Sequence, residues 1–127
     1  MVTATQPSKL TRREADIAVR LDRPTDPDLI ARHLTKHKLG LFAAKTYLEK
    51  HEVTADSKCL DGRDIITYQH RVTPRHAEKI CGLPITNARV TMEVSSAMMM
   101  LEATRAGIGI AELAVHLAEN APQLTRL

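Results

Sequence analysis

Several histidine and methionine side chains of this sequence could in principle bind a metal ion. His33 and His37 are four residues apart, a spacing at which two imidazoles on one helix face bind a metal ion. They flank segments with a strand-like pattern, and no His-Glu-x-x-His motif accompanies them. Met98, Met99 and Met100 offer soft thioether ligands, but consecutive methionines on a core-facing helix are typical of flexible packing. The sequence therefore predicts no metal and no cofactor.

The two cysteines, Cys59 and Cys81, raise the question of redox chemistry. Two thiols without a Cys-x-x-Cys spacing do not make a disulfide framework, which favours a reducing cytoplasm. A redox-sensing pair is the alternative. It is not favoured, because nothing around either residue in the sequence clearly lowers a thiol pKa.

Catalytic motifs are missing from the sequence. It contains no nucleophile elbow, no phosphate-binding loop and no pair of carboxylates in a recognisable catalytic setting. A small hydrolase or transferase that uses Cys81 or Cys59 is the one enzymatic hypothesis that stays open. We therefore do not expect an enzyme.

Composition limits the class of protein further. A length of 127 residues with 43% hydrophobic content suits one compact α/β unit or two small lobes. Aromatic content of 2% argues against stacking platforms for single-stranded nucleic acid. The net charge of +3 is spread along the chain, so we do not expect this chain itself to contact DNA. It has no export signal and no apolar run of membrane-spanning length, so no membrane contact and a cytoplasmic location are expected.

Apolar patterns and turn residues predict the elements of the first half. A buried strand is expected at residues 16–21, and a turn rich in proline and aspartate at 23–28. Extended segments at 29–34 and 39–43 precede a short helix at 45–50. A helical turn is expected at 55–60, a strand at 65–68, and loop with a little helix at 69–84.

The second half gives stronger patterns. Polar and apolar residues alternate over residues 89–94, which is the strand period. Ser95 or Ser96 caps the helix that follows, and Gly107 ends it. We also expect a strand at 108–111, a helix at 112–119 and an extended segment at 124–127. Alternating strands and helices predict an α/β fold with a parallel-type sheet.

Five passages, in order along the chain, resemble the effector-binding domain of LysR-type transcription regulators. They are LTRREADIAVRL at residues 10–21, DPDLIARHL at 26–34, LGLFAAKTYL at 39–48, SSAMMMLEATRA at 95–106 and AGIGIA at 106–111. The resemblance covers nearly the whole chain. No single motif is as specific as a metal-binding cysteine pattern, so the order and spacing of the five carry it.

The resemblance implies a two-lobed α/β fold similar to type 2 periplasmic solute-binding proteins. Residues 1–36 and 112–127 would belong to the first lobe, residues 40–108 to the second, and an inducer would bind in the cleft between them. The family's winged helix-turn-helix, linker helix and opening strand and helix have no counterpart here, nor do the last elements of the first lobe. We therefore expect a fragment, for which the family's side-by-side dimer is in doubt.

The resemblance also points to ligand-binding residues. Arg20 and Thr3 match cleft positions, and an arginine fork suits a carboxylate, although Arg20 as a solvated rim residue is an equal alternative. Ser95 and Ser96 would direct hydroxyl and N–H groups at an anion from the start of their helix, beyond acting as caps. Tyr68 and Gln69 are further candidates.

The resemblance and these candidate residues together suggest a hypothesis for the function of the chain. The chain would be the ligand-sensing domain of a LysR-type regulator that binds a small inducer, often a carboxylate in this family. The full-length protein would bind DNA through its missing N-terminal domain and form a homo-oligomer. The alternative is a solute-binding protein of the same fold that has no link to transcription.

Overall fold

A computed structural model of the chain describes residues 16–19, 25–53, 59–69 and 78–127. The chain divides into two compact units, Met1–Lys36 and His37–Leu127. In the described part of the first unit, Asp26 begins a turn: its carbonyl accepts from the N–H of Leu29 at 3.3 Å and its carboxylate from that of Asp28 at 3.0 Å. The turn predicted at 23–28 is thus confirmed over its described residues.

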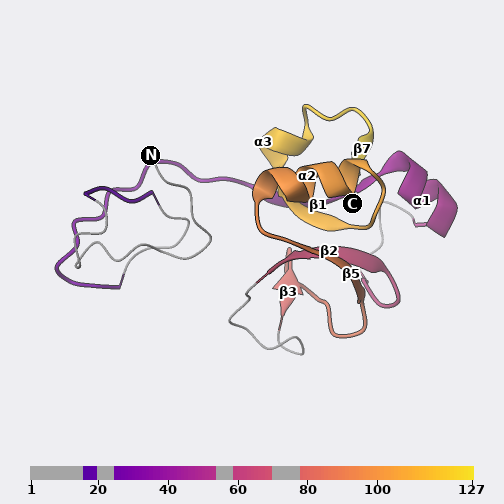
Figure 1. Ribbon diagram of the computed structural model, residues 1–127, viewed down its shortest axis with the longest axis horizontal. Helices are drawn as coiled ribbons and strands as arrows, with labels where there is room; N and C mark the ends of the chain where they lie inside the picture. The colour runs from indigo at the N-terminus through magenta and orange to yellow at the C-terminus, as the bar shows by residue number, and fades with distance from the viewer. Residues whose placement is uncertain (1–15, 20–24, 54–58, 70–77) are drawn as a thin grey trace. The chain divides into compact units, whose positions relative to one another are not determined.

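The helices and strands that the structure describes all lie in the second unit (Figure 1). In chain order they are β1 (Leu39–Ala44), α1 (Lys45–His51), β2 (Asp64–Tyr68), β3 (Lys79–Ile80), β4 (Leu83–Pro84), β5 (Arg89–Val94), α2 (Ala97–Arg105), β6 (Ala111–Ala114), α3 (Val115–Ala118) and β7 (Leu124–Arg126).

The strands form a three-stranded sheet and a two-stranded parallel sheet, which an isolated bridge joins. β1 lies between β6 and β7 and is antiparallel to both, while β2 and β5 are parallel. Ile110, just before β6, joins the two groups through a parallel bridge to Ile65 and accepts from the N–H of Ile66 at 2.9 Å. The resulting order is β5, β2, β6, β1, β7, and β3 with β4 makes a separate hairpin.

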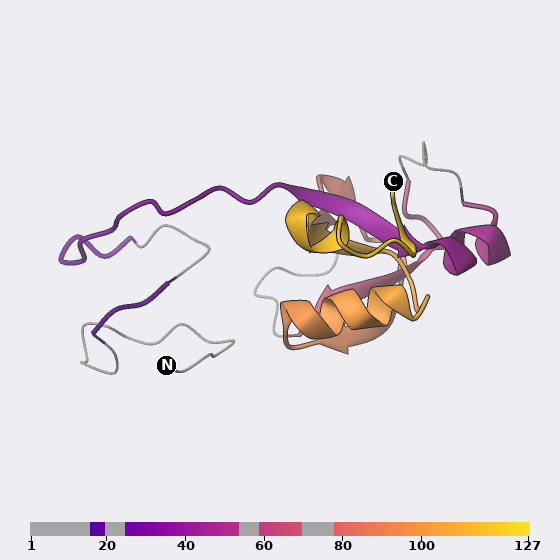
Figure 2. The ribbon, with the colours of Figure 1, turned by 90° about the horizontal axis from the view of Figure 1, so that it is seen from above.

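Alternate residues of the strands feed two hydrophobic cores, one on each face of the sheet. Phe42 and Ile66 belong to the core that includes Met100 and Leu101 of α2, whereas their neighbours Leu41 and Ile65 belong to the other. The second core also holds Tyr47 of α1 and Ile80 of the hairpin. Full burial of such side chains stabilises the fold by about 1.5–3 kcal/mol each. Figure 2 shows α2 alongside the strands that it covers.

α2 matches its prediction. It spans Ala97–Arg105, buries Met100, Leu101 and Thr104, and is followed by Gly107 at φ 74, a left-handed conformation that glycine adopts without steric cost. Ala97, the first residue of the helix, is exposed. The expected strands at 39–43, 65–68 and 89–94 and the helix at 45–50 are also confirmed.

Two predictions for the first unit do not hold. Asp16 to Val19 are not in a strand, and Ile17 and Val19 are 85% and 80% exposed rather than buried. Residues 29–34 likewise lie in no strand among the described residues. An apolar run becomes a strand only when another strand pairs with it, and no described strand does so here. The helical turn expected at 55–60 lies mostly outside the described residues.

Three further predictions are corrected in the second unit, again because strand pairing decides the structure. Residues 112–119 were expected to be one helix, but β6 takes Ala111–Ala114 and α3 only Val115–Ala118, because β6 pairs with β1. The strand expected at 108–111 accordingly begins later. Within residues 69–84, the described part holds the β3–β4 hairpin instead of helix.

The assignment of residues to lobes stays a prediction. The structure adds that β6 and β7 pair with β1 inside the unit His37–Leu127. Among the described residues, no helix is both long enough and apolar enough to cross a membrane.

Candidate functional site

The carboxyl ends of β2 and β5 form one edge of the parallel pair. Tyr68 lies opposite Val94 in the register, and the N–H of Gln69 donates to the carbonyl of Val94 at 2.9 Å. Ser95 and Ser96 follow Val94 directly. The structure therefore brings four of the six predicted site residues, from two segments 26 residues apart in register, to a single edge of the sheet.

Ser96 is the residue that caps α2. Its backbone is extended, with φ −145 and ψ 157, and its Oγ accepts from the N–H of Met99 at 3.2 Å. A hydroxyl that accepts one bond still has its own proton to donate. The first N–H groups of a helix have no intrahelical partners and carry the positive end of its dipole, so this edge favours an anion.

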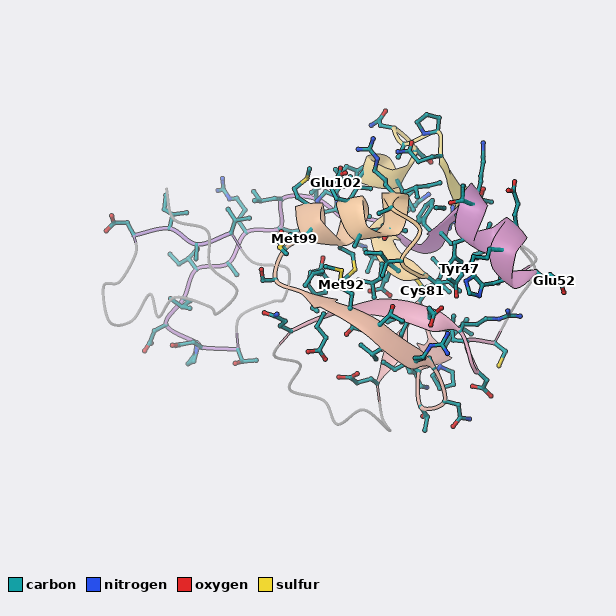
Figure 3. All side chains as sticks on the ribbon, turned by 45° about the vertical axis from the view of Figure 1, so that its right-hand side comes forward. Tyr47, Glu52, Cys81, Met92, Met99 and Glu102 are labelled. Atoms are coloured by element: carbon teal, nitrogen blue, oxygen red, sulfur yellow. The ribbon has the colours of Figure 1, made fainter. Side chains whose placement is uncertain are left out.

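Ser95 lies beside the cap and has a different role. Its Oγ donates to the Sδ of Met99 at 3.5 Å, a weak bond to a soft acceptor. Met98 and Met99 are 59% and 46% exposed, and Met99 stands at the start of α2 in Figure 3. Sequence reasoning took these methionines for core packing, which holds for Met100 but not for these two. The edge therefore offers polar donors next to exposed apolar side chains.

Arg20 and Thr3 lie outside the described residues. They also belong to the unit Met1–Lys36, whereas the other four candidates belong to His37–Leu127. Their part in a site stays a prediction.

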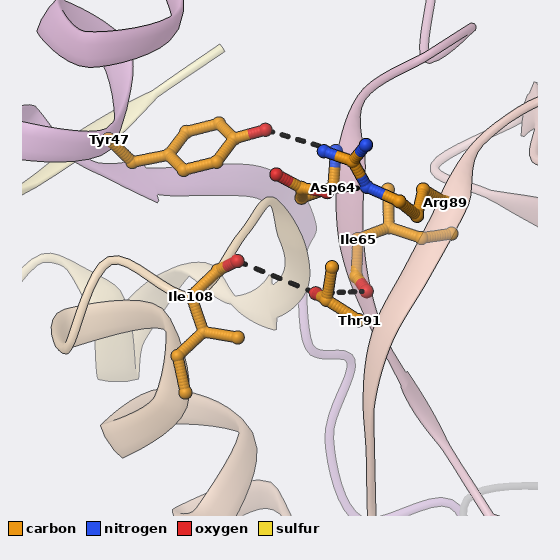
Figure 4. Close-up of polar contacts among 6 residues, drawn as sticks. All are labelled: Tyr47, Asp64, Ile65, Arg89, Thr91 and Ile108. Atoms are coloured by element: carbon orange, nitrogen blue, oxygen red, sulfur yellow. Dashed lines mark hydrogen bonds and ion pairs between the residues drawn. The ribbon is translucent and has the colours of Figure 1, made fainter.

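The amino ends of β2 and β5 carry a second polar group of residues, which sequence reasoning missed (Figure 4). Asp64 and Arg89 are opposite one another in the register and form an ion pair. The N–H of Asp64 donates to the hydroxyl of Tyr47 at 3.0 Å, and Thr91 donates to the carbonyl of Ile65 at 3.2 Å. The sequence could have indicated this pair, because Asp64 and Arg89 are the first residues of two strands that pair in parallel.

Burial and charge shift two pKa values in this group. The hydrogen bond from Arg89 lowers the pKa of Asp64, more than burial raises it. Burial is the main cause that raises the pKa of Tyr47, whose ring also stacks on His51 with centroids 4.3 Å apart. Both groups therefore keep one charge state near neutral pH, Asp64 ionised and Tyr47 neutral, which suits a structural role better than proton transfer.

The cysteines are both free and exposed. Partial desolvation of the Cys81 thiol, followed by its hydrogen bond to Glu112, raises its pKa to about 12. The thiol thus stays protonated at neutral pH, and the thiolate is the reactive form. This speaks against the redox-sensing alternative and against Cys81 as a nucleophile.

Known structures resemble this chain over most of its length. CrgA, a LysR-type transcriptional regulator from Neisseria meningitidis, is 25% identical with a TM-score of 0.75, over 93% of this chain and 42% of that one. The CrgA regulatory domain alone gives 23% identity and a TM-score of 0.73, over 92% and 59%. A full-length AphB variant is 18% identical with a TM-score of 0.59, over 83% of this chain and 37% of that one. No curated protein matches the chain.

The chain thus spans less than two thirds of the length of either CrgA structure. The family model for the LysR substrate binding domain matches residues 1–127, the whole sequence. That domain has a two-lobed α/β fold like that of periplasmic binding proteins, and the CrgA structures agree with it. The chain belongs to the LysR substrate-binding domain family, the ligand-sensing part of bacterial transcription regulators.

Proposed function

We propose that this chain senses a small anionic effector at the edge formed by the carboxyl ends of β2 and β5. The observation that carries the proposal is the parallel register of these strands, which sets Tyr68 and Gln69 beside Ser95 and Ser96 at the start of α2. Ligands of open α/β sheets bind at such edges, outside the carboxyl ends of the strands. The helix start supplies N–H groups to a carboxylate without any positively charged side chain.

Arg20 and Thr3 stay further candidate contacts of the effector in this proposal. A guanidinium forms two parallel hydrogen bonds with a carboxylate, so Arg20 would supply both the charge and the orientation. The exposed thioethers of Met98 and Met99 favour an effector with an apolar part beside its carboxylate.

Effector binding would act on the full-length regulator. A ligand that binds two lobes in one relative arrangement shifts the population toward that arrangement by its difference in affinity. We propose that this shift changes how the DNA-binding domains of a cytoplasmic homo-oligomer meet their operator. In the proposed lobe assignment, residues 1–36 and 112–127 form the first lobe and 40–108 the second.

A thermal-shift screen tests the effector class. Carboxylates with aliphatic and aromatic parts are compared with their uncharged amides, since a ligand that binds only the folded chain raises its Tm. We expect a rise for one class of carboxylate and none for the matching amide. An equal rise for carboxylate and amide would contradict an anion site.

Variants locate the binding. Arg20→Ala and Ser96→Ala should each reduce the Tm rise, measured against the ligand-free Tm of the same variant. Arg105→Ala is the matched control, because Arg105 lies at the far end of α2 and pairs with Glu102 at 2.8 Å. If all three variants keep the full rise, the effector binds elsewhere.

A further inference from the structure

Two histidines face each other near the point where β1 begins and β6 ends. The rings of His37 and His116 have centroids 4.7 Å apart and planes at 32°. The two residues are 79 positions apart in the sequence, so no local spacing brings them together.

The strand register explains the contact. In the antiparallel pair, Leu39 lies opposite Ala114 and Gly40 opposite Leu113, and His37 and His116 lie two residues beyond the last of these pairs, with His116 the second residue of α3. The N–H of Val115 donates to the carbonyl of Lys38 at 2.9 Å and carries the pairing one step beyond the strands. The backbone pairing therefore ends directly beside the two histidines and brings their segments together.

The surroundings leave both imidazoles open to solvent. His37 and His116 are exposed, and so are their neighbours Lys38, Glu119 and Asn120. The side-chain amide of Asn120 donates to the carbonyl of His116 at 3.0 Å, which helps to fix the backbone at the start of α3. The sheet thus presents two nitrogen ligands at its surface with their backbones already ordered, so metal binding would cost little further ordering.

We propose that His37 and His116 bind a divalent transition-metal ion of borderline softness, such as Cu²⁺, Ni²⁺ or Zn²⁺. Neutral imidazole is the common protein ligand of these ions, at metal–nitrogen distances of about 2.0–2.1 Å for zinc. In the part of the chain that the structure describes, no group of three or more His, Cys, Asp or Glu is placed to hold a metal. Water would therefore fill the remaining positions, and Cu²⁺ should bind best of the three.

The site has a consequence for the chain's organisation. His37 is the first residue of the unit His37–Leu127, directly after the unit that ends at Lys36. A bound metal would hold this first residue of the unit against the start of α3, and so hold the start of β1 against the end of β6.

The test uses the whole chain, with CuCl₂, ZnCl₂ and MgCl₂ as probes. We expect Cu²⁺ and Zn²⁺ to raise the Tm and Mg²⁺ not to, because magnesium prefers oxygen ligands. His37→Gln and His116→Gln should each weaken Cu²⁺ binding by at least about tenfold, since the loss of an outer-shell partner alone costs 10–100-fold. Both positions are exposed, so the variants should fold.

Control variants separate this pair from the other histidines. His33→Gln tests the alternative pair that helical spacing would give with His37, and a His70→Gln, His76→Gln double variant tests two further histidines of the sequence. These controls should bind Cu²⁺ like the unaltered chain. Imidazole proton signals of His37 and His116 should also shift together in an NMR titration with Zn²⁺. Unchanged binding in both site variants, equal loss in His33→Gln, or no metal-dependent change in the unaltered chain would each overturn the proposal.

Discussion

The two ends of the β2–β5 pair differ in how their polar groups are used. At the amino end, Asp64 is paired with Arg89 and its N–H with Tyr47, and Asp64 and Tyr47 are buried. At the carboxyl end, Ser95 and Ser96 are exposed at the start of a helix. Polar groups that are buried and mutually satisfied hold a structure together, whereas exposed donors at a helix start suit a ligand. Changes at the amino end should therefore affect stability, and changes at the carboxyl end should affect binding.

The largest loss of stability is expected from Gly109→Ala, near the amino end. A Cβ on Gly109 would lie 2.7 Å from the carbonyl oxygen of Asp64, which is backbone and does not give way cheaply. Overpacking of this kind costs about 3 kcal/mol, and urea unfolding measures it. The control is Gly62→Ala, where φ is +68 but no atom lies within 4 Å of the added carbon, so only about 1 kcal/mol should be lost. Equal losses would mean that the close approach to β2 is unimportant.

Tyr47→Phe should come next. It removes the acceptor of the Asp64 N–H but keeps the ring, so a buried donor loses its partner at a cost of about 1–3 kcal/mol. Thermal unfolding of the variant checks this loss, and a change of less than about 0.5 kcal/mol would show that the bond from the Asp64 N–H is unimportant.

A smaller change is expected from Ser96→Ala. Loss of the cap to the Met99 N–H should cost about 1 kcal/mol of stability. Ser95→Ala removes only the weak bond to the Met99 sulfur and should change stability by less than about 0.5 kcal/mol. If effector binding falls in Ser95→Ala while stability does not, the carboxyl end is confirmed as the binding end.

The smallest effect is the pH dependence of the Asp64–Arg89 pair, because the side chain of Arg89 is 66% exposed and water screens its charge. The folded-state pKa of Asp64 is lowered, so its contribution to stability is present above the unfolded-state pKa of about 3.9. That contribution is lost as the pH falls through the folded-state value. Asp64→Asn should reduce the fall in the free energy of unfolding as the pH is lowered. An unchanged fall would show that other carboxylates cause it.

Local patterns in the sequence predicted several elements well. The alternation in residues 89–94, the capping serines and Gly107 identified β5 and α2 because their signals act within a few residues. Four of the six predicted site residues also proved to share one edge, since parallel strands bring their ends together. The positions of Arg20 and Thr3 stay predictions.

Long-range pairing limited the rest. Glu112 to Ala114 fit a helical pattern as well as a strand, and only the partner strand β1 made them a strand. The Asp64–Arg89 pair joins residues 25 apart and the His37–His116 contact joins residues 79 apart, so neither follows from local spacing.

The sequence by itself determined the family, most of the second unit's strands and the helix that starts at the proposed effector edge. Those features depend on side-chain periodicity, capping and turn chemistry, which neighbouring residues fix. The tertiary structure alone decided the sheet order β5, β2, β6, β1, β7, the direction of β1 and the pairs of charged and imidazole side chains. Hydrogen bonds between strands join distant residues, and many registers satisfy the same local pattern until the two cores select one.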